Sequence, residues 1–190
     1  SLLAEVGVTD VGENRDQEGR AKRSGVRSDE LRWHMIGRLQ RNKVSSVARW
    51  ADIVESIDRH ELIAPLAGAV ERFDRKPVQV LLQVSLDPMP DPGRGGIDPN
   101  DVESLAEAVA GHEALHLAGV MAVAPHPDTG VNPRAAFDRL YEISALVRAS
   151  WPNAREISAG MSSDLEAGVA AGATQVRIGG AILGERPPVQ

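Results

Sequence analysis

Residues 155–178 read REISAGMSSDLEAGVAAGATQVRI. A short apolar run at Arg155–Ser158 precedes a helical stretch at Asp164–Ala171, and a second apolar run follows at Gln175–Ile178. Ser162 and Ser163 are predicted to cap the helix N-terminus, and Gly172 to end it. The order of strand, helix and strand is typical of a parallel βαβ unit.

The same alternation extends towards the N-terminus. Further apolar runs rich in Val, Ile and Leu are typical of strands buried on both faces; they lie at Val8–Val11, Trp33–Ile36, Ile53–Ile57, Val78–Val84 and Leu117–Val123. Helical periodicity is present between them at Glu61–Arg72, Asp101–Ala110 and Pro133–Ala149. The chain therefore contains seven predicted strands, most of them followed by a helix.

Repeated βα units form either a closed barrel or an open, doubly wound sheet. The first residues, Ser1–Gly7, have the pattern of a helix end with a glycine C-cap. Seven strands plus one preceding that helix would make the eight of a (β/α)₈ TIM barrel. We therefore predict one barrel domain over residues 1–190, with its first strand upstream of Ser1. A seven-stranded open sheet is the alternative.

Composition excludes several classes of site. The 190 residues include no cysteine, which excludes disulfides, iron–sulfur clusters, zinc–thiolate sites and cysteine nucleophiles. The formal net charge is −6, which disfavours non-specific binding to nucleic acid. No apolar run approaches the roughly 20 residues that span a bilayer. The five histidines do not have metal-ligand spacing. These features favour a cytoplasmic protein that binds neither metal, nucleic acid nor membrane.

The strand ends near the C-terminus contain the strongest candidate site. Residues 176–184 read VRIGGAILG, a strand entering a glycine pair, and residues 158–164 read SAGMSSD. The loops after the last two strands of a barrel commonly bind phosphate, because glycine lets backbone amides approach it closely. Gly179, Gly180 and Ser162 are therefore candidate phosphate ligands. The alternative is that the glycines only end a strand and Ser162 only caps a helix.

Three other polar residues follow or interrupt apolar runs. Arg177 lies within an apolar strand, where it either pairs with a carboxylate or faces a ligand at the barrel mouth. Asn14 follows the first predicted strand and would orient a ligand or cap the next helix. His34 lies within a strand and is interpreted as a core residue. Two loops rich in Pro and Gly, at 87–100 and 124–133, are expected on the same C-terminal face.

Five ordered motifs resemble one known family. They are Gly12-Glu13-Asn14, residues 33–43 (WHMIGRLQRNK), Ser56-Ile57-Asp58, residues 158–164 and residues 176–184. Together they resemble the pyridoxal 5′-phosphate (PLP) homeostasis protein family, also called the YggS or PROSC family. The resemblance extends from about Val8 to Arg186. Arg15 and the Arg94-Gly95-Gly96 loop depart from the common pattern and suggest an actinobacterial-type branch.

The resemblance implies a barrel like the N-terminal domain of alanine racemase, the fold type III PLP group. It implies a cytoplasmic, monomeric carrier or regulator of PLP without established turnover, with PLP-dependent apoenzymes as recipients. By the same resemblance, Ser162, Gly179 and Gly180 would hold the phosphate, with Ser158 close by. Arg177 would face the pyridine nitrogen, and Asn14 would flank the ring.

The family attaches PLP to a lysine at the end of the first strand. This sequence contains only Lys22, Lys43 and Lys76, none of which is predicted at the C-terminal end of a strand. The resemblance therefore places the Schiff-base lysine upstream of Ser1.

Two alternative functions are a PLP-dependent amino-acid racemase and a barrel that binds another phosphorylated metabolite. A racemase commonly uses a tyrosine, and the only one here, Tyr141, is predicted on an outer helix.

Overall fold

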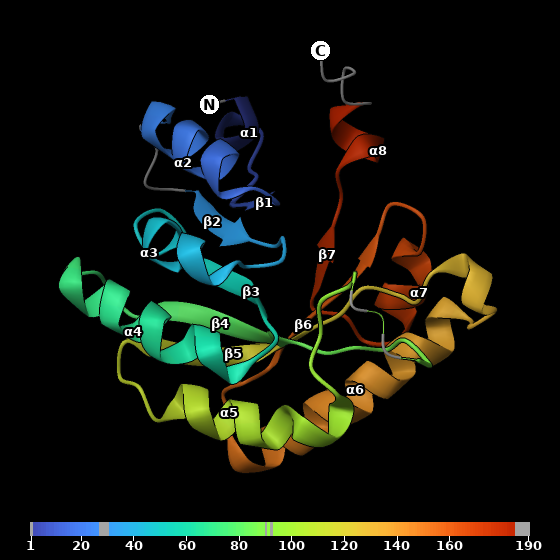
Figure 1. Cartoon of the computed structure of the whole chain (residues 1–190). Coiled ribbons are helices and arrows are strands. Elements are labelled where there is room, and N and C mark those ends of the chain that lie inside the picture. Colours follow the sequence, from blue (N-terminus) through green and yellow to red (C-terminus); the bar gives the residue numbers. More distant parts are fainter. Residues whose placement is uncertain (1, 27–30, 90, 92, 185–190) are drawn as a thin grey trace.

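The computed structural model describes residues 2–26, 31–89, 91 and 93–184, and contains a single curved sheet with helices outside it (Figure 1). All seven strands are parallel, and each is hydrogen-bonded to the next in sequence order. They are β1 (Asp10–Glu13), β2 (Arg32–Met35), β3 (Ile53–Ile57), β4 (Val78–Gln83), β5 (Leu115–Met121), β6 (Glu156–Met161) and β7 (Gln175–Arg177).

Helices follow the strands and cover the outer face of the sheet. The α-helices are α1 (Leu2–Glu5), α2 (Asp16–Gly25), α3 (Val44–Val47), α4 (Ile63–Arg72), α5 (Val102–Ala110), α6 (Pro133–Ser150), α7 (Leu165–Ala170) and α8 (Gly180–Leu183). Short 3₁₀ helices are η1 (Arg41–Lys43), η2 (His60–Leu62), η3 (Pro99–Asp101) and η4 (Pro127–Thr129). Within the described residues, no helix is both long and apolar enough to cross a bilayer.

The strand order decides between the two predicted architectures. A doubly wound sheet reverses its strand order at a switch point, whereas this order runs from β1 to β7 without reversal. Side chains also meet across the concave face: Ser158 on β6 and Gln175 on β7 donate to Glu55 on β3, at 2.6 and 2.7 Å. The sheet is therefore the wall of a barrel. In the described part of the chain it is open between β1 and β7, which do not pair.

The larger core lies between the outer face of the sheet and the helices. It includes fully buried Leu66 of α4, Leu105 of α5 and Leu140 of α6. A smaller apolar cluster lies on the other face, formed by Ile53, Leu81, Ala118 and Met121. Burial on both faces explains why the strands are continuously apolar in sequence.

The predicted elements are all present, with shifted ends. The strand at Ile53–Ile57 matches β3. The run at Val8–Val11 begins two residues before β1, and the run at Leu117–Val123 begins two residues after the start of β5. Gly7 has φ of +84° and donates its N–H to Ala4 O, as expected of a glycine that ends a helix.

The predicted cap of α7 was wrong in detail. The residue before the helix is Asp164, not Ser162 or Ser163, and the structure shows no side-chain cap of the helix. The Asp164 carboxylate instead accepts a hydrogen bond from the Met161 N–H at 2.6 Å. That bond closes the turn between β6 and α7, so Ser162 and Ser163 are exposed at its tip.

Candidate functional site

The loops after β6 and β7 bring the predicted phosphate ligands to one end of the barrel. Ser162 lies in the exposed turn between β6 and α7, and Gly179 and Gly180 lie where β7 passes into α8. The first N–H groups of a helix have no acceptor within the helix. These positions therefore combine a hydroxyl with backbone amides, which is the kind of donor set that binds phosphate.

The space around Gly179 and Gly180 does not by itself require glycine, as judged from the described residues. Neither residue has a positive φ, and a Cβ built at either would meet nothing within 4 Å. By contrast, a Cβ at Gly168 would lie 2.7 Å from the Ala159 carbonyl oxygen, so packing requires that glycine. The space above Gly179 and Gly180 is open to a group that approaches the backbone from outside.

Arg177 is the most constrained cation at this end of the barrel. Its side chain is 9% exposed. Nη1 donates to the carbonyl oxygen and the hydroxyl of Ser158, at 2.9 and 2.6 Å, and Nη2 donates to Ala122 O at 2.7 Å. Among the described residues, Nε–H has no hydrogen-bond acceptor. Three of the five guanidinium N–H donors are thus used, and Nε–H is among those left for another partner.

A buried carboxylate that the sequence reasoning did not select lies behind Arg177. Glu55 is fully buried, and its Oε2 is 4.0 Å from Arg177 Nη1. Burial raises the pKa of Glu55, but hydrogen bonds from His34 and Ser158 and the charge of Arg177 outweigh this and lower the pKa overall. A charged residue inside the apolar run at Ile53–Ile57 was the sequence signal that could have identified it.

The two interpretations of Arg177 are therefore compatible in this structure. The guanidinium lies near the Glu55 carboxylate on one side, and it keeps an unused donor. Burial lowers the pKa of Arg177, and the charges of Glu55 and Asp164 oppose that effect. Arginine remains protonated in proteins, so Arg177 can only donate hydrogen bonds.

The other two predicted polar residues, Asn14 and His34, do not contact Arg177 directly in the described part of the chain. Asn14 is exposed in the loop after β1, and it does not cap α2, because Arg15 occupies the residue before that helix. Its backbone packs tightly on the next loop: a Cβ at Gly37 would lie 2.0 Å from Asn14 O. His34, as interpreted, is a buried core residue, with both ring nitrogens hydrogen-bonded.

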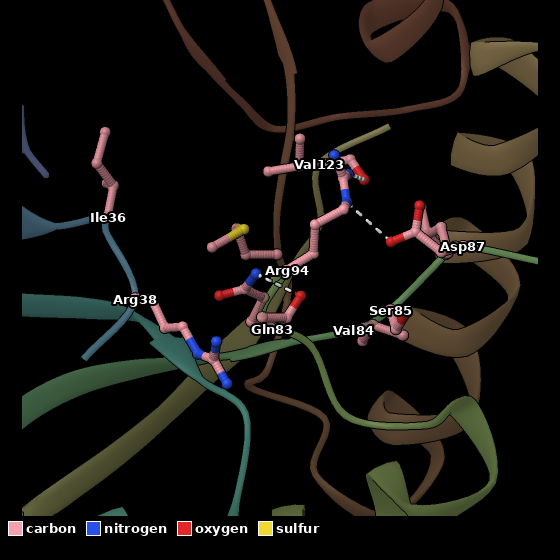
Figure 2. Close-up of a pocket in the computed structure, with 11 residues that line it drawn as sticks. Ile36, Arg38, Gln83, Val84, Ser85, Asp87, Arg94 and Val123 are labelled. Carbon is pink, nitrogen blue, oxygen red and sulfur yellow. Dashed lines mark hydrogen bonds and ion pairs between the residues drawn. The ribbon is translucent and has the colours of Figure 1, made fainter. Parts of the chain in front are cut away.

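A cavity of about 220 Å³ lies at the C-terminal ends of β2, β4 and β5 (Figure 2). Its lining includes Arg38, Gln83 and Met121. Arg94 closes one side: Nε donates to Asp87 at 2.9 Å and Nη2 donates to Ala124 O at 2.7 Å. This residue therefore fastens the loop at 87–100 to the loop at 124–133, and both lie on the C-terminal face as predicted.

The sequence is similar to one protein family and to named bacterial proteins. The model described as "Alanine racemase, N-terminal domain" matches residues 1–187. The chain is 40% identical to the pyridoxal phosphate homeostasis protein of Mycobacterium tuberculosis strain H37Rv, over 98% of this chain and 77% of that protein. It is 39% identical to the protein of the same name from Corynebacterium glutamicum, over 98% of this chain and 84% of that protein.

The fold is also similar to that of solved structures. PipY of Synechococcus elongatus, in a structure without PLP, has a TM-score of 0.83 and 31% identity, covering 93% of this chain and 82% of PipY. A structure of PipY with PLP bound has a TM-score of 0.81 and 29% identity over the same shares. The barrel architecture described above is therefore that of PipY.

Proposed function

The chain belongs to the alanine racemase N-terminal domain family, and we propose that it binds PLP and acts as a carrier or regulator of this cofactor. Its relatives at 39–40% identity are named pyridoxal phosphate homeostasis proteins, and PipY has been solved with PLP bound. The observation that carries the proposal is the pairing of an open glycine-rich turn with a buried arginine, Arg177, whose Nε–H is unused.

The residues present fit this cofactor at its two polar ends. Ser162 and the amides of Gly179 and Gly180 would hold the phosphate, where the backbone is open on the outer side. The Nε–H of Arg177 would donate to the pyridine nitrogen, because Nη1 already donates to Ser158 and Nη2 to Ala122. Asn14 would flank the ring. When bound, PLP supplies an aldehyde that reacts with amines.

Arginine at the pyridine nitrogen suits a carrier or a racemase better than a transaminase. It stays protonated and cannot accept a proton from the ring. The ring nitrogen would then remain unprotonated, which makes the cofactor a weaker acceptor of electrons. Tyr141, the only tyrosine in this sequence, is 45% exposed on α6 and stacks near Arg148. Its place in the outer layer of helices disfavours it as the second acid–base group of a racemase.

The contacts that we assign to this chain are non-covalent. Lys22 lies on α2 and donates to Glu13 at 2.7 Å, Lys43 lies in η1, and Lys76 precedes β4. We further propose that the protein is cytoplasmic and monomeric, and that PLP-dependent apoenzymes receive the cofactor from it.

Titration of the purified chain with PLP, read by tryptophan fluorescence and by equilibrium dialysis, tests the proposal. We expect one saturable site, much weaker binding of pyridoxal because it lacks the phosphate, and competition by inorganic phosphate. After borohydride reduction, peptide mapping should show no specific pyridoxyl group on Lys22, Lys43 or Lys76. The absence of saturable PLP binding would refute the proposal. Tight binding of a sugar phosphate instead would favour another phosphorylated metabolite as the ligand.

The carrier role needs a separate measurement. We expect no racemisation of alanine by the PLP-loaded protein, and reactivation of a PLP-dependent apoenzyme mixed with it. Turnover at rates well above those of free PLP would instead favour the racemase alternative.

A further inference from the structure

Five side chains form a hydrogen-bonded row across the barrel interior. Asp10 Oδ1 lies 2.8 Å from His34 Nε2, and His34 Nδ1 lies 2.6 Å from Glu55 Oε1. On the other side of Glu55, Oε2 accepts from the Ser158 hydroxyl at 2.6 Å. That hydroxyl in turn accepts from Arg177 Nη1 at 2.6 Å. The row links β1, β2 and β3 to β6 and β7.

Glu55 is the centre of this row and has no exposed surface. Burying a carboxylate among residues such as Ile53 and Met121 is costly unless several donors compensate it. Here His34, Ser158 and the side-chain amide of Gln175 all donate to Glu55, and Arg177 lies 4.0 Å away. Leucine or isoleucine would fill such a core position at lower cost, so packing alone does not explain a carboxylate there.

The carboxylate determines which way the Ser158 hydroxyl points. A hydroxyl has one proton and two lone pairs. Because Glu55 takes the proton, Ser158 Oγ can only present a lone pair to Arg177 Nη1. The Ser158 carbonyl oxygen holds the same Nη1 group from a second direction at 2.9 Å. The orientation of the guanidinium, and with it the direction of the unused Nε–H, therefore depends on the charge of Glu55.

We propose that Glu55 is a positioning residue, which holds Arg177 in the orientation that presents Nε–H to the pyridine nitrogen. This inference rests on the proposed function, because it assigns the ring nitrogen as the partner of Arg177. Glu55 does not contact the cofactor in this assignment. It acts through Ser158 and through its charge.

The variant Glu55→Gln tests the proposal, because an amide has one oxygen where the carboxylate has two. If the amide nitrogen faces Ser158, the hydroxyl turns its proton towards Arg177, and two donors oppose each other. If it faces the other way, it meets the donors of His34 and Gln175. Asp16→Asn is the matched control: Asp16 is also a buried carboxylate, but it binds Ser46 and Trp50 in the outer layer.

The first readout needs no cofactor. Proton exchange of the Arg177 guanidinium, followed by ¹⁵N NMR, reports how firmly Nη1 and Nη2 are held. We expect exchange at least five-fold faster in Glu55→Gln and unchanged in Asp16→Asn. Unchanged exchange in a folded Glu55→Gln protein would overturn the inference, whatever happens to PLP binding.

The second readout is PLP affinity in a double-mutant cycle with Ser158→Ala. We expect each single variant to raise the PLP Kd at least five-fold, and the double variant to be no worse than the weaker-binding single. Fully additive losses would mean that Glu55 acts on the fold and not through Ser158, and would overturn the inference. If Glu55→Gln does not fold, Ser158→Ala alone must still accelerate Arg177 exchange. If the unaltered chain does not bind PLP, the proposed function is refuted, and Glu55 loses its role toward the cofactor. The exchange experiment needs no PLP, so it still shows whether Glu55 holds Arg177 in place.

Discussion

His34 and Glu55 share a hydrogen bond of 2.6 Å between Nδ1 and Oε1 in the barrel interior, where His34 is 2% exposed. The second ring nitrogen of His34 faces Asp10. An imidazole with a carboxylate at each nitrogen donates from both, and is therefore protonated. Burial lowers the pKa of His34, but the hydrogen bonds and charges of Glu55 and Asp10 outweigh burial and raise the pKa overall.

This geometry predicts a pH-dependent stability. A group whose pKa is raised on folding stabilises the folded state fully below its unfolded pKa, about 6.5 for histidine, and this contribution is lost as the pH rises through the folded pKa. Urea unfolding of the unaltered chain between about pH 6 and pH 9 should therefore show a declining free energy of unfolding. His34→Gln should be less stable at pH 6 and have a flatter profile. Parallel profiles for the two proteins would contradict a charged His34.

Loss of a direct cofactor contact should weaken PLP binding without unfolding the protein. A hydrogen bond to a charged group contributes about 1.5–3 kcal/mol, so Ser162→Ala and Arg177→Ala should each raise the PLP Kd by about ten-fold or more. Ser163→Ala is the control for Ser162, because it is the exposed neighbour in the same turn. Unchanged PLP affinity in both Ser162→Ala and Arg177→Ala would show that the site is assigned wrongly.

The glycine pair offers a test in which stability and binding change in opposite directions. Gly180 begins α8 in open space, so Gly180→Ala should raise helix stability by up to about 1 kcal/mol. The added methyl group would occupy the path of a phosphate, and the PLP Kd should increase. Gly68→Ala on α4 makes the same change in open space on the outer layer, and should leave PLP binding unchanged. Equal PLP affinity of Gly180→Ala and the unaltered chain would place the phosphate elsewhere.

Arg94 should control the loops beside the cavity and not the stability of the barrel. Arg94→Ala removes the links to Asp87 and Ala124 O, so the loop at 87–100 should be cut earlier in limited proteolysis. The midpoint of thermal unfolding should fall only slightly. Arg134→Ala, which removes an exposed pair with Asp138, is the control and should not change the cleavage pattern. Cleavage of Arg94→Ala at the rate of the unaltered chain would exclude the fastening role.

Local pattern was sufficient to predict the elements of this protein and the sequence positions of the glycine turn. The apolar run at Ile53–Ile57 and the helix periodicity at Pro133–Ala149 depend only on residues close in sequence, so they are visible in the sequence itself. The same holds for Gly179 and Gly180, whose conformational freedom belongs to the residue type.

The tertiary structure decided which residues meet across the barrel. Glu55 and Ser158 are 103 positions apart, and only the curvature of the sheet brings their side chains to 2.6 Å. The choice between a barrel and an open sheet was settled in the same way, by the strand order and by contacts between β3, β6 and β7. A charge inside the apolar run at Ile53–Ile57 marks Glu55 as unusual, just as its strand marks Arg177. The sequence does not show that Glu55 meets His34 and Ser158, because only the folded barrel brings these side chains together.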